Sequence, residues 1–315
     1  MQRKPFYFKG DTFKNRYRIT GTLWTKSPMH IGTGETRADK AFEESDAYKN
    51  LSDEEKKKTK VPEIGEIARD YRDYPYIPGS TLRGVLRHFL LQLFQPINAH
   101  IARIENYETH ARGEYAKQAD QIIYIRDHAC MLDQLFGTPF HESKVEFWDA
   151  YLENPIPENA NTAKLKEKGW DNEGQSYVVR SVAIDPETGA AAPNKLYSFD
   201  VAPPGQKYKL DIVGYNLDHE ELGMLITGLC GFNSEILPLQ IGAMAGRGFG
   251  HLKFTLENIF YIENGNIKNY LSLALNNNLA GFDYLPLIVH ENEKWQDCVK
   301  NFKDEFFAYA KGVGK

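Results

Sequence analysis

Hydrophobic and polar residues alternate in several short segments of the chain, and this pattern predicts strands. In residues 16–26 (RYRITGTLWTK), β-branched and aromatic residues mix in rough alternation, and we expect this segment to be the first strand of a core sheet. The other segments with a strand pattern are residues 145–152, 176–184, 207–215 and 251–262. The turn sequence DPETG follows one of them, so residues 185–205 are expected to form a protruding hairpin.

Other hydrophobic residues recur with helical spacing. Residues 75–94 carry one apolar stripe, which predicts an amphipathic helix. The stripe consists of Leu82, Val85, Leu86, Phe89, Leu90 and Leu93. A second helix is predicted from Asp218, where Glu221 completes a capping box, to Gly231. Its buried residues are expected to be Leu222, Leu225, Ile226 and Leu229. A third amphipathic helix is predicted over about 292–311, with Trp295, Val299, Phe302, Phe306 and Tyr309 on its apolar face.

The order of these elements is strand, helix, strands, helix, strand. It predicts an α+β protein with a ferredoxin-like (RRM-like) core, a frame that often presents RNA-binding sheets. We expect one elaborated domain over residues 1–315, with large insertions in the core. The insertions are expected at about 35–74 (a polar loop), 98–127 (helical), 153–176 (polar) and 185–205 (the hairpin).

The composition is typical of a globular protein, but the net charge argues against a general nucleic-acid binder. Of 315 residues, 42% are hydrophobic and 26% are charged, and the net charge is -5. Nucleic-acid-binding proteins usually carry a basic excess, so an RNA site must be a local basic groove. The chain has no apolar run long enough for a membrane span and no signal-peptide core, so we expect a cytoplasmic protein without a membrane partner.

A predicted helix start at residues 78–81 (PGST) offers one candidate phosphate site. Pro78 and Gly79 allow a close approach, and Ser80 is a good N-cap residue. Free backbone N–H groups, the helix dipole and the hydroxyls of Ser80 and Thr81 would together suit a phosphate. On its own, this segment is better explained as an ordinary capped helix.

Two arginines follow one turn apart on the same helix. Arg83 and Arg87 are expected beside the apolar stripe, so both could contact the same RNA phosphates. Gly84 costs about 0.5–1 kcal/mol relative to alanine within a helix, which indicates that something approaches the backbone closely there. The alternative is a pair of solvated arginines.

A glycine-rich segment at residues 241–254 (IGAMAGRGFGHLKF) is a second candidate. Gly246 and Gly248 flank Arg247, and further glycines stand at positions 242 and 250. The segment is neither a Walker loop nor a dinucleotide fingerprint, since it lacks GK[ST] and leads into a strand. Its amides and Arg247 could cradle a phosphate, with Phe249 available to pack or stack. A plain glycine-rich hairpin explains the segment equally well.

The end of the first strand carries a third candidate, in residues 29–35 (MHIGTGE). His30 precedes Gly32 and Gly34, and it could be a general acid/base or donate to a phosphate. A lone histidine at a strand end is more often structural. Carboxylates that could hold a divalent ion against an RNA phosphate follow it: Glu35, Asp39, Asp46 and Glu63. Their spacing favours none of them.

Taken together, these segments resemble the RAMP superfamily of CRISPR proteins, in particular the repeated backbone subunit of type III (Csm and Cmr) effector complexes. The resemblance rests on ordered pieces that span most of the chain: MHIGTGE, YIPGSTLRGVLR, LFGTPFHESKVEFWDA, VAIDPETGAAAPNKLYSFDVAPPGQKY and IGAMAGRGFGHLKF. YIPGSTLRGVLR looks like the helix-opening motif of the family, with Arg83 where a lysine is common. GRGFG looks like its glycine-rich loop.

The resemblance implies a palm-like ferredoxin fold that aligns with sister subunits along a guide RNA (crRNA) paired with target RNA. Residues implied to contact guide phosphates are Ser80, Thr81, Arg83, Arg87 and Arg247 with its neighbouring glycines. The hairpin is implied to be a thumb that enters the guide–target duplex, with Arg180 at its base. The thumb residues named by this similarity are Ile184, Asp185, Thr188, Gly189 and Ala190.

The resemblance also raises the question of target-RNA cleavage. In such backbone subunits a loop aspartate after the HIG segment cuts bound RNA with a divalent metal. Here the loop between Gly34 and Tyr76 is longer than expected, and no aspartate falls unambiguously at that place. In order of preference the candidates are Asp39, Asp46 and Glu63. Mg²⁺ or another divalent ion would be the cofactor, and no organic cofactor is expected.

Other interpretations of the resemblance differ in what the chain does. A free-standing endoribonuclease that processes repeat RNA would need His30 paired with a lysine or tyrosine. A structural or capping subunit of the same type of complex would contact RNA little. The arginines at 83, 87, 180 and 247 favour a guide-binding subunit over a spacer, and the predicted thumb favours it over a processing nuclease.

Overall fold

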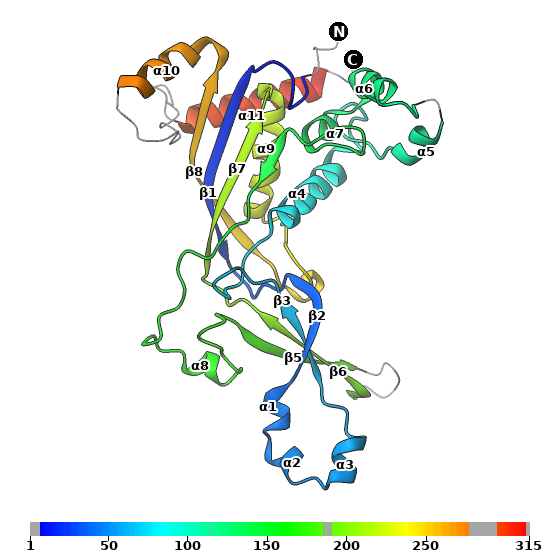
Figure 1. The fold of residues 1–315 in the computed structure, drawn as a ribbon, viewed down its shortest axis with the longest axis vertical. Coiled ribbons are helices and arrows are strands. Elements are labelled where there is room, and N and C mark those ends of the chain that lie inside the picture. The colour runs from blue at the N-terminus through cyan, green and yellow to red at the C-terminus, as the bar shows by residue number, and fades with distance from the viewer. Residues whose placement is uncertain (1–6, 114, 185–186, 188–190, 277–294, 313–315) are drawn as a thin grey trace.

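The computed structural model describes residues 7–113, 115–184, 187, 191–276 and 295–312. The chain has mixed α+β structure with two four-stranded sheets. Figure 1 shows the first sheet in the upper half of the molecule, with helices behind it, and the second sheet below. The predicted α+β class is therefore confirmed.

The first sheet is antiparallel, with the strand order β4-β7-β1-β8. Its strands are β1 (Asn15–Thr25), β4 (Val145–Phe147), β7 (Lys207–Tyr215) and β8 (Leu252–Glu263). Helices α4 (Gly79–Phe94) and α9 (His219–Cys230) follow β1 and β7 in the chain. This is the strand–helix–strand–strand–helix–strand order that the sequence predicts. The strand predicted over 145–152 is shorter, because the ladder to β7 ends at Phe147.

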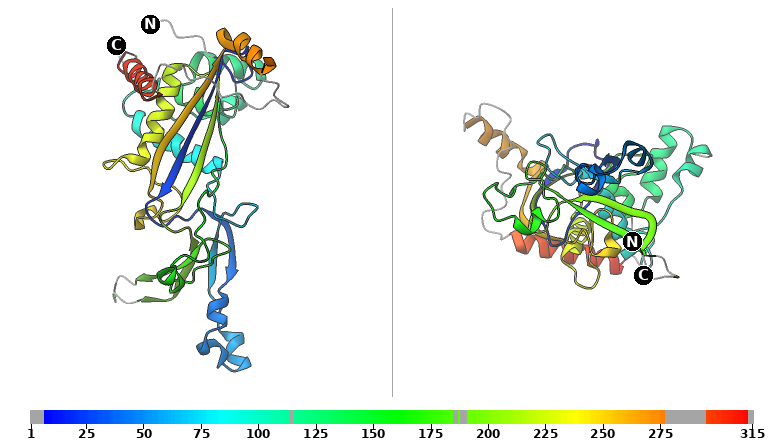
Figure 2. Two further views of the ribbon diagram at one scale, coloured as in Figure 1. Left: turned by 90° about the vertical axis from the view of Figure 1, so that its left-hand side faces the viewer. Right: turned by 90° about the horizontal axis from the view of Figure 1, so that it is seen from below.

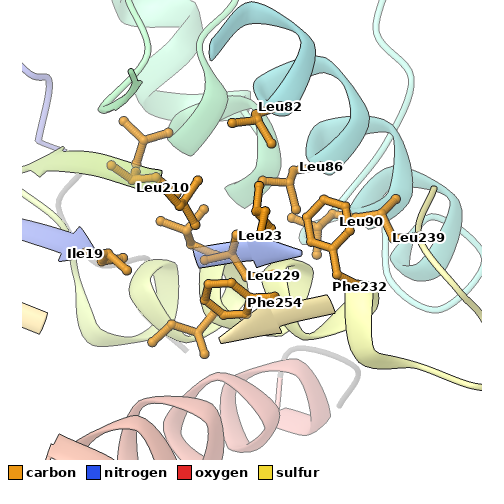
Figure 3. Packing of buried hydrophobic residues seen from close by; sticks show 14 of the residues in the cluster. Ile19, Leu23, Leu82, Leu86, Leu90, Leu210, Leu229, Phe232, Leu239 and Phe254 are labelled. Carbon is orange, nitrogen blue, oxygen red and sulfur yellow. The ribbon is translucent and has the colours of Figure 1, made fainter. Parts of the chain in front are cut away.

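The core lies between this sheet and its helices. Ile19 and Leu23 of β1 point toward α4 and α9, and both are buried. On α4, Leu82, Leu86 and Leu90 are completely buried, as the helical spacing predicts. Figure 3 shows these side chains packed against each other and against β7, β8 and α9. Each fully buried leucine contributes about 1.5–3 kcal/mol relative to an exposed one, so this contact fixes α4 on the sheet.

The C-terminal helix α11 (Trp295–Gly312) packs against α9. A Cβ at Gly223 of α9 would lie 2.1 Å from the carbonyl oxygen of Phe302, so only glycine permits this approach. Phe306 is fully buried, and its ring lies 5.1 Å from that of Phe94 on α4. Figure 2 shows α9 and α11 on the same side of the strands. The predicted helix is confirmed over the described residues, and η3 (Asn264–Asn266) and α10 (Ile267–Asn276) precede it.

The second sheet has the order β2-β3-β6-β5, and β3 pairs with β6 in parallel. Its strands are β2 (Gly32–Ala38), β3 (Glu63–Ile67), β5 (Tyr177–Ile184) and β6 (Ala191–Val201). Strands β5 and β6 form a hairpin that extends away from the first sheet (Figure 1). Residues 185–186 and 188–190, at the predicted tip, lie outside the described residues.

The insertion at 35–74 differs from the predicted loop. It contains the two strands β2 and β3 and, between them, short helices. These are α1 (Lys40–Glu43), α2 (Asp46–Lys49) and α3 (Asp53–Lys58). Every residue of β2 is exposed, so its sequence carries no alternation that could reveal a strand. Ser45 and Ser52 cap α2 and α3 through their hydroxyls, which explains why this polar sequence still forms helices.

The remaining insertions contain short helices and turns. The helical one contains α5 (Tyr107–Arg112) and α6 (Gln118–His128), followed by α7 (Met131–Phe136). It has a small core of its own, formed by Tyr107, Tyr124, Ile125 and Ala129. In the part of the chain that the structure describes, the polar insertion contains one helix, α8 (Ala163–Lys166). The short turn η1 (Gly231–Asn233) precedes the glycine-rich segment, and η2 (Ala245–Arg247) lies within it. Among the described residues, no helix is long and apolar enough to cross a bilayer.

Candidate RNA interface

The start of α4 differs from the predicted serine cap. The N-cap residue is Pro78, which makes no side-chain cap, so the prediction that Ser80 caps the helix was wrong. Helix α4 begins at Gly79, which packs on β4, and a Cβ there would lie 2.0 Å from the carbonyl oxygen of Phe147. The N–H of Gly79 donates to Asp149 Oδ1 at 2.8 Å, so a carboxylate already occupies part of the helix terminus. Ser80 is the second helical residue, and it is exposed.

The two arginines of α4 are used inside the chain. Arg83 donates to the carbonyl oxygen of Phe136, and Arg87 Nη2 lies 2.7 Å from Asp133 Oδ1. Asp133 is completely buried and also accepts from the hydroxyl of Tyr107 at 2.7 Å. Burial, together with the charge of Arg87, lowers the pKa of Arg83. Both arginines therefore hold α4 against α7, instead of lying free on the surface as predicted.

The exposed face of α4 is open where Gly84 lies. No atom comes within 4 Å of a Cβ built at Gly84, and Ser80 is exposed one turn before it. An external chain could therefore approach the helix backbone along this face, as the glycine predicts. Thr81 is half-buried, and its N–H donates to the carbonyl oxygen of Pro78 at 3.0 Å.

The glycine-rich segment is held firmly at both ends. Gly242 and Gly250 have φ angles of 83° and 76°, in the left-handed region. A Cβ would lie 2.2 Å from the carbonyl oxygen of His30 at Gly242 and 2.0 Å from that of Ile241 at Gly250. The N–H of Ala243 donates to His30 O and the N–H of Gly250 to Pro28 O, both at 2.8 Å. These contacts fix the segment on the chain that leaves β1.

The middle of the segment is open to the outside. Gly246, Arg247 and Gly248 are exposed, and a Cβ at either glycine would meet no atom within 4 Å. The guanidinium of Arg247 lies 4.9 Å from the ring centroid of Tyr197 on β6, and among the described residues it forms no ion pair. Phe249 is half-buried, with its ring 5.9 Å from that of Phe199. The loop thus presents a cation on an aromatic ring, on an anchored backbone.

His30 has a structural place beneath this loop. It is 8% exposed, and its Nδ1 lies 2.6 Å from the carbonyl oxygen of Asp200, to which it must donate. Its ring also contacts Phe199 at 5.3 Å. His30 therefore ties β6 to the loop, which matches the structural alternative for a lone histidine. Gly32 and Gly34 begin β2 on the surface, and Gly34 has a φ of 88° with open space around it.

Buried carboxylates and arginines connect the strands of the second sheet. Asp200 is 1% exposed and lies 2.9 Å from Arg37 and 3.8 Å from Arg69. Asp39 is 3% exposed, and its Oδ2 lies 2.8 Å from Arg180 Nη2. Arg180 does lie on β5 near the base of the hairpin, as predicted, but it pairs with Asp39. These pairs join β2, β5 and β6 into one unit.

The candidate carboxylates do not gather into one metal-binding group within the described residues. Asp39 is next to a guanidinium, which disfavours a second cation, and it also caps α1 by accepting from the N–H of Phe42. Asp46 and Glu63 are exposed, and Glu63 accepts from the hydroxyl of Thr36 at 3.3 Å. Within the described ranges, no group of three or more His, Cys, Asp or Glu side chains could hold a metal ion. Asp39 is therefore a poor ligand for the implied metal, and Asp46 and Glu63 lie outside any such group.

The thumb candidates lie mostly beyond the part of the chain that the structure describes. Ile184 ends β5, opposite Ala191 of β6. Asp185, Thr188, Gly189 and Ala190 lie outside the described residues.

Sequence reasoning missed several residues that shape this interface. Tyr197 supports Arg247, Asp200 joins His30 to two arginines, and Asp133 removes Arg87 from the surface. A signal for Tyr197 exists, because aromatic residues alternate at 197 and 199 and so share one face of β6. The partners of Asp133 and Asp200 lie far away in sequence and leave no local signal.

A comparison with family models supports the resemblance seen in the sequence. The model of the RAMP superfamily matches residues 22–253. The match covers more than half of the chain, including α4, the β5–β6 hairpin and the glycine-rich segment. No curated protein matches the chain.

Proposed function

The chain belongs to the RAMP superfamily of CRISPR proteins, and from this premise we propose that it is a guide-RNA-binding backbone subunit of a type III effector complex. Its partners would be guide RNA, complementary target RNA and sister effector subunits. The ferredoxin-like sheet would be the palm and the β5–β6 hairpin the thumb. The proposal assigns the chain a role in antiviral defence through RNA binding.

The observation that carries the proposal is the anchored glycine-rich loop. Arg247 is exposed and lacks an ion-pair partner within the described part, and the Tyr197 ring beneath it limits its motion. A guanidinium in this setting can make charge-assisted hydrogen bonds to a phosphate. The exposed amide of Gly246 can add a donor without a side chain in the way, whereas the N–H of Gly248 already donates to the carbonyl oxygen of Ala245 at 2.9 Å. This is a local cationic site in a chain of negative net charge.

A second contact is proposed along the exposed face of α4. Ser80 and Gly84 are a turn apart on it, so an RNA backbone could lie close to the helix. Arg83 and Arg87 support this contact by fixing α4 on α7. Their proposed role is thus to position the helix, and the phosphate contacts fall to Ser80, Thr81 and Arg247.

The proposed role is binding, and cleavage would require a carboxylate other than Asp39. Asp39 is committed to Arg180 and to the cap of α1. Asp46 and Glu63 are exposed, so only these two candidates could meet a target phosphate without breaking an ion pair.

The test is RNA binding by the full chain with Arg247→Ala. We expect weaker binding for all guide sequences and a salt dependence reduced by about 0.7 in slope, the value for one lost single-strand phosphate contact. Arg112→Ala is the matched control, because Arg112 is an exposed arginine on α5 with an 84% exposed side chain. Equal affinities of wild type and Arg247→Ala across a salt titration would overturn the proposed contact.

A structural or capping subunit of the same type of complex is the second candidate. It is favoured by the finding that Arg83, Arg87 and Arg180 all have partners within the chain. Such a subunit would co-purify with sister subunits from its own locus yet show no change in RNA content when Arg247 is replaced.

A further inference from the structure

One face of the first sheet is not covered by any helix in the part of the chain that the structure describes (Figure 1). Ile19, Leu23 and Leu210 point to the face that packs on α4 and α9 (Figure 3). Because side chains alternate along a strand, their neighbours in β1 and β7 point to the opposite face. Figure 1 views the sheet from this second side, and α4, α9 and α11 lie behind it.

Lysines flank a tryptophan across three strands of this uncovered face. Trp24 of β1 is directly opposite Lys207 of β7 and Lys253 of β8. Opposite residues of antiparallel strands share a face, so the three side chains form one row. In the next row, Thr22 is opposite Lys209. The end of the sheet at which Trp24 lies therefore concentrates positive charge around an indole ring.

The indole and the ammonium groups are accessible. Trp24 is 40% exposed, and Lys207 Nζ lies 5.7 Å from its ring centroid. Together with Lys26 and Lys253 they line a shallow hollow of about 530 Å³, in which Glu257 is the carboxylate. Among the described residues, neither Lys26 nor Lys253 forms an ion pair, whereas Lys207 has Glu153 at 3.6 Å. The hollow is thus net positive.

A second ring continues the platform. Trp148 follows β4, and its backbone N–H donates to the carbonyl oxygen of Asp211, which places Trp148 beside β7. Trp148 is 43% exposed, and its ring lies 5.3 Å from the guanidinium carbon of Arg18 on β1. Arg18 and Trp24 occupy alternate positions of β1, so both tryptophans belong to the uncovered face.

From these contacts we infer that the uncovered sheet face binds single-stranded RNA, with one base on Trp24 and phosphates on Lys207, Lys209 and Lys253. Exposed aromatic rings bordered by cations are the general device for holding single strands, because every base has a π-face and every link carries a charge. The exposed indole distinguishes this surface from a binding site for an acidic protein, because such a site would need only the lysines. The inference does not depend on the guide contact at Arg247, which lies in a different segment.

The test measures binding of a fluorescein-labelled oligouridine to the full chain by anisotropy. Trp24→Ala should weaken binding about tenfold, the effect of one lost stacking contact. Lys207→Ala with Lys253→Ala should lower the slope of affinity against salt by about 1.4, since two phosphate contacts are lost. Trp24→Phe keeps a ring and should retain most of the affinity.

Matched controls separate this effect from general charge or aromatic loss. Tyr71→Ala removes the ring of a residue that is 87% exposed, and Lys57→Ala with Lys58→Ala removes two exposed lysines on α3. Both controls should bind as wild type does, and thermal unfolding of each variant shows that it is folded.

Each remaining outcome decides the inference. The inference is overturned if folded Trp24→Ala binds RNA as tightly as wild type does. It is also overturned if Lys57→Ala with Lys58→Ala loses as much RNA affinity as Lys207→Ala with Lys253→Ala. The inference is also overturned, in favour of an acidic protein partner, if binding of a poly-glutamate peptide depends on Trp24 while binding of oligouridine does not. If Arg247→Ala has no effect while Trp24→Ala does, the guide contact fails and the sheet-face site stands.

Discussion

The carboxylate of Asp39 and the guanidinium of Arg180 form an ion pair, with Oδ2 and Nη2 2.8 Å apart, that links the start of α1 to strand β5. One partner was the preferred catalytic residue and the other was expected to meet RNA at the base of the thumb. Their pairing assigns both to the internal structure of the second sheet. The carboxylate also accepts from the N–H of Phe42, so it has two structural uses.

Asp39→Ala should lower the free energy of unfolding by about 1–2 kcal/mol, from loss of the cap and of a partly exposed ion pair. The measurement is urea unfolding of the full chain. Asp46→Ala is the control, since this carboxylate is exposed, and it should change stability by less than about 0.5 kcal/mol. Equal stability of both variants would contradict the structural role of Asp39.

Metal-dependent cutting of a complementary target by the assembled complex tests the cleavage hypothesis. If cutting occurs at this subunit, we expect it to vanish with Asp46→Ala or Glu63→Ala, because these carboxylates are exposed. Asp39→Asn should retain cutting in complexes that assemble. Loss of cutting in that variant, with normal assembly and stability, would return Asp39 to the reaction.

Arg87→Ala should destabilise the fold, because it leaves the fully buried carboxylate of Asp133 without its cation. We expect a loss of about 1–3 kcal/mol, below the range for fully buried pairs because Arg87 is 34% exposed. Denaturant unfolding measures it, and Arg112→Ala, on an exposed arginine, should be neutral. This loss is not foreseeable from the sequence, because the helical spacing places Arg87 beside the apolar stripe and does not reveal Asp133 as its partner.

The sequence predicts most clearly what depends on local periodicity. The stripe from Leu82 to Leu93 and the capping box of Asp218 and Glu221 both appear as predicted, because each is formed within one helix. The incorrect predictions concern residues whose partners lie far away in the sequence. Asp149 takes the helix terminus predicted for Ser80, and Asp133 takes Arg87, over separations of 70 and 46 residues. No local pattern encodes such contacts.

Strands β2 and β3 of the second sheet were missed for a related reason. Strand β2 is exposed along its whole length, and strand β3 pairs with β6 across more than a hundred residues of sequence. The glycine-rich segment was the reverse case: its glycines were noticed, and the structure supplies the reason for Gly242 and Gly250 in their left-handed backbone.

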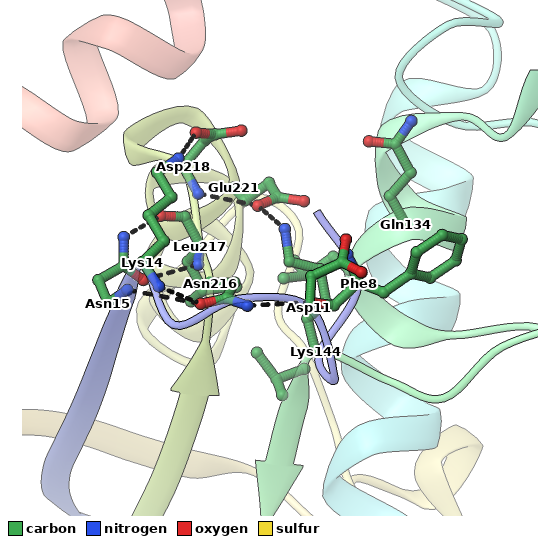
Figure 4. Close-up of polar contacts among 12 residues, drawn as sticks. Phe8, Asp11, Lys14, Asn15, Gln134, Lys144, Asn216, Leu217, Asp218 and Glu221 are labelled. Carbon is green, nitrogen blue, oxygen red and sulfur yellow. Dashed lines mark hydrogen bonds and ion pairs between the residues drawn. The ribbon is translucent and has the colours of Figure 1, made fainter. Parts of the chain in front are cut away.

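A buried ion pair at the start of α9 predicts a pH dependence of stability. Lys144 and Glu221 are 1% and 3% exposed, and Nζ lies 2.5 Å from Oε2 (Figure 4). Burial raises the pKa of Glu221 above its ordinary value of 4.5, against the opposing effect of Lys144. A raised carboxyl pKa favours the folded state below the unfolded value, and that stability is lost as pH rises through the folded value.

Lys144→Met removes the opposing cation, so the pKa of Glu221 should rise further. The variant should lose about 3–5 kcal/mol at neutral pH and clearly less near pH 4. Urea unfolding at both pH values measures the difference. Adding Glu221→Gln removes the titrating group while keeping an acceptor for the N–H of Asp218, so the double variant should lose this pH dependence. A single variant with the same deficit at both pH values would contradict the argument.

The anchored glycine-rich loop gives a prediction that separates loop position from loop chemistry. Gly242→Ala places a Cβ 2.2 Å from the carbonyl oxygen of His30 at a φ of 83°, so the loop must shift and stability should fall by about 1–3 kcal/mol. Gly246→Ala adds a methyl group where no atom lies within 4 Å, so the fold should be unaffected.

RNA affinity should fall in Gly242→Ala because Arg247 is displaced. In Gly246→Ala it should fall only if the phosphate approaches the backbone at that glycine. Unfolding curves and binding isotherms of both variants, measured in one salt series, distinguish the cases. Wild-type stability in Gly242→Ala would show that the loop is not anchored at His30, and the placement of Arg247 would then lose its support.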